Sequence, residues 1–132
     1  MGVYRPYDHL ASTMKLIHNS RRSEYRVPFG AVVAGTTVHL TLRVEDADAS
    51  FLVGEVRTWV DERGEELIPM GLGENNTLVA DIPCPETCIL WYSFRVTCTD
   101  GSQLNVGARE GSTGGEAVTY MGRTDVPSFQ IT

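Results

Sequence analysis

The chain has 132 residues and a mass of 14.5 kDa, so it has room for one ordinary domain with one core. Its 42% hydrophobic and 21% charged residues are usual for a globular protein, and no apolar stretch is long enough to span a bilayer. A net charge of −6 argues against general nucleic-acid binding, which uses Lys and Arg to neutralise phosphates. A disordered chain, a transmembrane protein and a general nucleic-acid binder are therefore excluded.

The elements predicted along the chain are strands. Residues 1–13 show no strand pattern, and we expect a flexible lead-in there. Beyond them, alternating apolar and polar positions and runs of β-branched or aromatic residues indicate strands, and no segment is typical of a helix. In chain order the predicted strands are 14–18, 37–45, 51–61, 65–70, 77–82, 88–99, 103–108 and 128–132.

Turn signals separate these strands. Asp-Glu-Arg-Gly at 61–64 predicts a hairpin, and Pro83 and Pro85 are expected to end the strand at 77–82. Asp100-Gly101 predicts a two-residue type I′ turn, because Asp and Gly tolerate positive φ angles.

The number and spacing of the strands predict an all-β fold, an antiparallel β-sandwich of about seven or eight strands over residues 14–132. We favour a sandwich over a barrel because the strands are of unequal length. The last predicted strand reaches the end of the sequence without a closing loop. We therefore expect the natural polypeptide to continue beyond Thr132.

Residue types that carry chemistry occur in patterns too incomplete for a site. Cys84 and Cys88 lack the second pair of ligands that a structural zinc site needs. The acidic turn 45–48 lacks the glycine and distal glutamate of a calcium-binding loop. No motif of a hydrolase or a phosphate-binding loop is present. We predict no catalytic residues, no metal and no cofactor, and hence no enzyme in this chain by itself.

Two further features bear on location and surface. The odd number of cysteines, three, fits poorly with a disulfide framework, and the sequence after Met1 lacks the apolar region of a signal peptide. A cytoplasmic protein with reduced thiols is expected. We interpret the basic cluster of Arg21, Arg22 and Arg26 as ordinary surface ion pairing.

Trp59 and Trp91 are the candidate binding residues. Each lies in a predicted strand whose alternation places it away from the core, if Thr58 and Val60 face inward on one strand and Tyr92 on the other. Exposed indole faces can stack on sugar rings, which would make the pair a carbohydrate-binding platform. The alternative is that each tryptophan packs against a loop or another domain.

Several segments resemble one family in the order in which they occur. Residues 17–32 contain His18, Ser20, Tyr25 and Pro28 at the spacing found at the start of N-terminal domains in glycoside hydrolase family 13, the α-amylase and neopullulanase-like enzymes. The segments that follow in register are Gly35–Arg43, Val56–Trp59, Ile68–Met70, Leu90–Phe94, Gly114–Glu116 and Phe129–Thr132. The resemblance covers nearly the whole chain.

This resemblance implies an immunoglobulin-like β-sandwich that precedes a (β/α)8 barrel hydrolysing α-glucosidic bonds. The catalytic carboxylates of the family belong to that barrel, so none is assigned to a residue here. The implied partners are the barrel of the same polypeptide, maltodextrin or starch, and a second copy in a homodimer of the full-length enzyme. An independent carbohydrate-binding module and a free-standing immunoglobulin-like interaction domain remain the alternatives.

Overall fold

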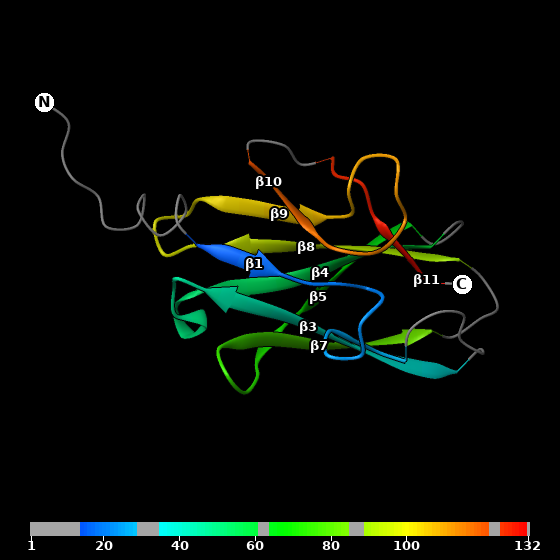
Figure 1. Ribbon diagram of the computed structural model, residues 1–132, viewed down its shortest axis with the longest axis horizontal. Coiled ribbons are helices and arrows are strands. Elements are labelled where there is room, and N and C mark those ends of the chain that lie inside the picture. Colours follow the sequence, from blue (N-terminus) through cyan, green and yellow to red (C-terminus); the bar gives the residue numbers. More distant parts are fainter. Residues whose placement is uncertain (1–13, 29–34, 61–63, 85–88, 122–124, 132) are drawn as a thin grey trace, which may run out of the picture.

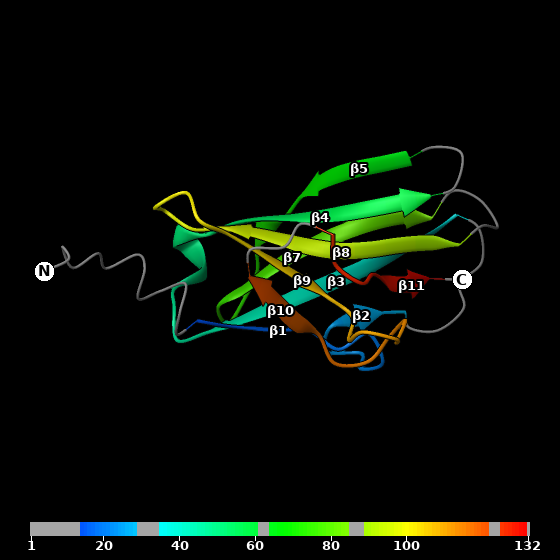
Figure 2. The same ribbon diagram turned by 90° about the horizontal axis from the view of Figure 1, so that it is seen from above.

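The computed structural model describes residues 14–28, 35–60, 64–84, 89–121 and 125–131, and the statements below concern these residues. They form two antiparallel sheets packed face to face (Figures 1 and 2). The strands are β1 (Lys15–Ile17), β2 (Arg26–Val27), β3 (Thr36–Glu45), β4 (Val53–Val60), β5 (Gly64–Pro69), β6 (Gly71–Leu72), β7 (Thr77–Cys84), β8 (Leu90–Thr97), β9 (Gln103–Gly107), β10 (Val118–Met121) and β11 (Phe129–Ile131). A 3-10 turn, η1 (Ala49–Phe51), precedes β4.

The order of the strands is that of an immunoglobulin-like sandwich. One sheet has the order β1-β3-β7-β6, with β2 also on β3, and the other has β10-β9-β8-β4-β5, with β11 also on β8. These orders correspond to strands A-B-E-D and G-F-C-C′ of that fold, with β2, β10 and β11 added. The predicted all-β sandwich is confirmed.

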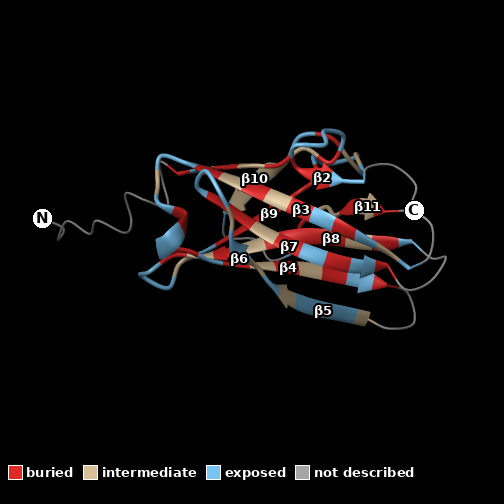
Figure 3. Ribbon diagram, turned by 90° about the horizontal axis from the view of Figure 1, so that it is seen from below, coloured by how far each residue is buried: buried red, intermediate tan, exposed pale blue. Residues whose placement is uncertain are grey.

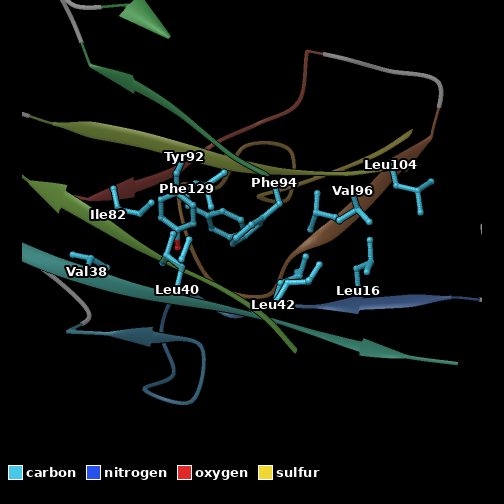
Figure 4. Packing of buried hydrophobic residues seen from close by; sticks show 14 of the residues in the cluster. Leu16, Val38, Leu40, Leu42, Ile82, Tyr92, Phe94, Val96, Leu104 and Phe129 are labelled. Carbon is cyan, nitrogen blue, oxygen red and sulfur yellow. The ribbon is translucent and has the colours of Figure 1, made fainter. Parts of the chain in front are cut away.

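The core lies between β3 and β8, as the alternation of both strands predicts. Val38, Leu40 and Leu42 of β3 are fully buried, and so are Tyr92 and Phe94 of β8. Figure 4 shows these side chains meeting between the two sheets. β5, the edge strand of the second sheet, is mostly exposed (Figure 3).

A fully buried histidine lies at the centre of this core. The Nδ1–H of His18 donates to the carbonyl oxygen of Thr41 in β3, 2.9 Å away, and the hydroxyl of Tyr92 in β8 donates to Nε2, 2.8 Å away. A carbonyl only accepts hydrogen bonds, so Nδ1 carries the proton, and in the neutral ring Nε2 is then the acceptor. Burial, with a smaller contribution from the charge of Arg26, lowers the pKa of His18 from 6.5 to about 4.

Two strands share one edge of β8. β9 pairs with residues 94–97 of β8 and β11 with residues 90–92, both antiparallel to β8. The chain leaves this edge after β9 and returns to it at β11, so the residues in between form an inserted segment, described at 109–121 and 125–128. The insertion passes close to β9, where the Ala108 N–H donates to the Pro127 carbonyl oxygen at 2.8 Å.

All eight predicted strands are present, and three short ones, β2, β6 and β10, were not predicted. β2 and β6 have only two residues each, too few to show alternation. The expectation that Pro83 ends its strand is wrong, because β7 continues to Cys84. β6 pairs only with Leu78 and Val79, so the ladder beside Pro83 is open on that side and tolerates a residue without an N–H.

The turn at Asp100-Gly101 also differs from the prediction. The Gly101 N–H donates to the carbonyl oxygen of Cys98 at 3.0 Å, and of the two turn residues only Gly101 has a positive φ, 89°. This is a three-residue loop with glycine in the left-handed position, rather than a type I′ turn. Phe51, predicted to begin a strand, instead ends the η1 turn.

Some expectations fall outside the described residues. These are the flexible lead-in at 1–13, the turn residues 61–63, Pro85 and Cys88, and the end of the chain at Thr132. Within the described residues, no helix is long and apolar enough to cross a membrane.

We predict that the stability of the fold decreases as the pH falls from about 6.5 to about 4. The unfolded chain binds a proton at His18 in this range and the folded chain does not, so protonation favours unfolding. The full effect is roughly 3 kcal/mol. Urea unfolding at a series of pH values measures it, with His39→Gln, a change at an exposed histidine, as the control. If the stability of His18→Gln depended on pH as strongly as that of the wild type, the assignment of this effect to His18 would be wrong.

A second prediction concerns the close approach of the inserted segment to β9. A Cβ atom at Gly107 would collide with the carbonyl oxygen of Pro127, and backbone cannot swing away as a side chain can. Gly107→Ala is expected to cost about 2 kcal/mol or more in the free energy of unfolding. Gly71→Ala is the control, since no atom lies within 4 Å of a Cβ added there. Equal stability of the two variants in thermal unfolding would refute this account.

Candidate functional site

Trp59 and Trp91 lie side by side on the outer face of the second sheet. They are register partners in the pairing of β4 with β8, and side chains opposite each other in a sheet have their Cβ atoms about 5 Å apart. Trp59 is 48% exposed and Trp91 is partly buried. Thr58, Val60 and Tyr92 face inward, as the sequence predicts. The sequence did not predict that the two indoles adjoin.

The pair belongs to a row that crosses four strands. Glu65 of β5 is the partner of Trp59, and Gln130 of β11 is the partner of Trp91. The Glu65 carboxylate accepts two hydrogen bonds from Arg57, from Nε at 3.2 Å and from Nη2 at 3.1 Å. Both indoles are therefore flanked by polar groups, and one of these groups is held by a bidentate ion pair. We call Glu65, Trp59, Trp91 and Gln130 the tryptophan row.

A shallow depression of about 90 Å³ lies along this row. The inserted segment forms one wall, through Asp125, Val126 and Ser128. Pockets that enclose a small molecule usually measure about 300 to 1,000 Å³, so this surface can support a ligand but not enclose one. Two adjacent indoles with a polar rim suit a flat, uncharged, hydroxyl-rich molecule that offers C–H groups to one face.

A larger hollow of about 520 Å³ lies on the outer face of the first sheet, between the polar face of β3, the 73–75 turn and Tyr25. At its side, Nδ1 of His39 lies 2.7 Å from the Asp81 carboxylate, and the Arg43 guanidinium lies 3.6 Å from the Glu45 carboxylate. Tyr25 is 7% exposed, so it offers no aromatic face. No sequence pattern predicted this hollow, because its lining residues come from three segments far apart in the chain.

The other sequence candidates have structural roles. The Asp48 carboxylate accepts hydrogen bonds from the hydroxyl and the N–H of Ser50, which lower its pKa and cap η1. Cys84 and Cys98 are buried, and neither is part of a disulfide. No group of three potential metal ligands occurs among the residues that the structure describes.

The basic cluster divides into three different environments. Arg22 lies near Glu24, 4.0 Å away, as expected for a surface pair. Arg26 is buried, contrary to the expectation: it donates to the carbonyl oxygen of Gln130 at 3.1 Å and lies over the ring of Tyr92. Surface pairing was wrong for Arg26 because the short strand β2 turns its side chain towards the core. Arg21 is exposed, against the loop at Gly114.

No family model, curated protein or solved structure matches the chain. Of the residues that carry the family resemblance, His18 and Tyr25 are buried, and the Ser20 hydroxyl accepts a hydrogen bond from the N–H of Gly115 at 2.8 Å. These three residues maintain the fold, whereas Trp59, Trp91 and Gln130 of the tryptophan row fall in later segments that carry the resemblance.

The two tryptophans should differ in access to solvent. Trp91→Phe retains only Trp59, and Trp59→Phe retains only Trp91. We expect acrylamide to quench the fluorescence of Trp91→Phe more strongly, because Trp59 is the more exposed indole. Stern–Volmer plots of both variants make the comparison, and stronger quenching of Trp59→Phe would contradict the described surface.

Proposed function

We propose that this chain is the non-catalytic, immunoglobulin-like domain of an α-amylase-like glycosidase and that its tryptophan row contacts α-glucan. In this proposal the catalytic barrel follows in the same polypeptide, and the chain itself hydrolyses nothing. The proposal rests on the family resemblance for the parent enzyme and on the tryptophan row for the contact with sugar.

The single observation that carries the glucan contact is the adjacency of Trp59 and Trp91. Two indoles opposite each other on neighbouring strands offer an extended apolar surface on an outer sheet face. The rim supplies hydrogen-bonding groups from Glu65, Gln130 and Ser128. An α-glucan has apolar C–H faces edged by hydroxyls, which is the complementary arrangement.

The position of β11 is compatible with a barrel beside this surface. Gln130 is the register partner of Trp91, so a domain joined after β11 would begin next to the tryptophan row. A glucan held on the row would then lie near such a barrel. Neither of the two described cysteines is part of a disulfide, which agrees with the cytoplasmic location that we propose for the enzyme.

Titration of the folded domain with maltoheptaose, followed by intrinsic fluorescence, tests the glucan contact. We expect a saturable change in the wild type and about a tenfold or greater increase in Kd for Trp59→Ala, because loss of a stacked aromatic anchor costs more than about 1 kcal/mol. Phe51→Ala is the matched control. It removes an exposed aromatic residue before the start of β4, away from the tryptophan row, and should leave the Kd unchanged.

A flat response of the wild type up to millimolar maltoheptaose would overturn the glucan contact. Thermal unfolding of each variant shows whether a lost response reflects lost folding. The parent enzyme is tested separately, by the natural reading frame. A frame that continues into a (β/α)8 barrel supports the glycosidase, and a stop directly after Thr132 refutes it and favours a free-standing interaction domain.

A further inference from the structure

A second hollow lies along one edge of the sandwich, away from the tryptophan row. It measures about 250 Å³ and is formed by the turn before β2 and by the loop of the inserted segment between β9 and β10. Figure 2 shows this loop beside β2. Its lining residues are Arg21, Arg109, Ser112, Gly114, Gly115 and Glu116. Two arginines in one hollow are notable in a chain whose net charge is −6.

Two adjacent glycines give Arg21 its place in the hollow. Its guanidinium atoms lie 3.6 to 3.9 Å from the positions that Cβ atoms would occupy at Gly114 and Gly115. A side chain at Gly114 would also approach the Ser20 hydroxyl to 2.9 Å. The guanidinium can therefore lie against bare backbone, where its position is restricted without any charged partner.

The arginines are not neutralised within the described part of the chain. Neither the Arg21 nor the Arg109 guanidinium forms a hydrogen bond or an ion pair with a described residue. Glu116 also lines the hollow, but its carboxylate is farther than 4.0 Å from both. The hollow thus contains two arginines and one glutamate, and the glutamate forms an ion pair with neither arginine.

The loop that holds these residues is tied to both sheets. The Ser20 N–H donates to the carbonyl oxygen of Gly115 at 3.0 Å, and the Ala117 N–H donates to that of His18 at 2.8 Å. The Gln130 N–H of β11 donates to the carbonyl oxygen of Thr113 at 2.9 Å. Because these bonds fix the backbone before any ligand arrives, little ordering is required on binding.

We propose that this hollow binds a phosphate group, either free or as a phosphomonoester. A phosphate dianion carries two negative charges and oxygen atoms on several sides, so it can accept hydrogen bonds from two guanidinium groups at once. A single carboxylate matches one guanidinium in charge and geometry. A neutral glucan leaves both arginines uncompensated. The site is independent of the proposed glycosidase function and of the tryptophan row.

Calorimetric titration of the folded chain with inorganic phosphate at constant ionic strength tests the site. We expect saturable 1:1 binding with a Kd on the order of 1 mM, as suits an exposed site with two charge-assisted contacts. Arg21→Gln and Arg109→Gln should each raise the Kd about tenfold. A parallel titration with glucose 6-phosphate shows whether an ester binds as well as the free anion.

Two further variants separate a built site from general attraction to positive charge. Arg22→Gln removes the same charge from the neighbouring residue, which lies outside the hollow and near Glu24, and should leave the Kd unchanged. Glu116→Gln removes the opposing carboxylate and should tighten binding about threefold. All four residues are exposed, so these variants are expected to fold.

The absence of saturation below tens of millimolar phosphate would overturn the proposal. Equal weakening by Arg22→Gln and Arg21→Gln would also overturn it, since binding would then follow net charge alone. Binding of glucose by the same residues would replace the phosphate with a neutral sugar as the ligand. None of these results depends on the maltoheptaose titration, so the two proposals fail separately.

Discussion

The two sheets are joined at their centre by one buried imidazole. His18 donates to the backbone of β3 through Nδ1 and accepts from the Tyr92 hydroxyl of β8 through Nε2. The Thr41 carbonyl fixes a proton on Nδ1, and burial, which lowers the pKa of the ring, keeps it neutral so that Nε2 accepts. The rings of Phe94 and Phe129 pack edge-on against it, with centroids 4.8 and 5.1 Å away. A buried polar group that is fully satisfied in this way specifies one arrangement of the two sheets.

The outer surface depends on that arrangement. Phe129 belongs to β11, and its contact with His18 holds this strand in place on β8. Arg26 supports the same strand by donating to the carbonyl oxygen of Gln130. With β11 fixed, Gln130 lies beside Trp91 and the inserted segment forms the wall of the depression. The packing of the core therefore determines the position of the candidate glucan-binding surface.

The residues of the first resembling segment and those that carry the proposed binding chemistry have different tasks. His18 and Tyr25 are buried, and Ser20 forms a hydrogen bond with the loop at Gly115. A resemblance based on these residues therefore supports the sandwich fold more directly than a function. The tryptophan row and the two arginines of the phosphate hollow lie at the surface, on strands and loops that this packing positions. For that reason both proposals are tested by ligand binding rather than by stability.

The sequence by itself determined the class of fold, eight of the eleven described strands and the inward faces of β3, β4 and β8. Alternation is a local property, readable wherever a strand has one buried face. It could not determine that Trp59 adjoins Trp91, that Arg26 turns inward, or that Arg21 and Arg109, 88 positions apart, line the same hollow. These depend on strand register and on loops that close between distant segments. Only the tertiary structure decides them, because register is set by pairing between chain segments and by the packing of one sheet on the other.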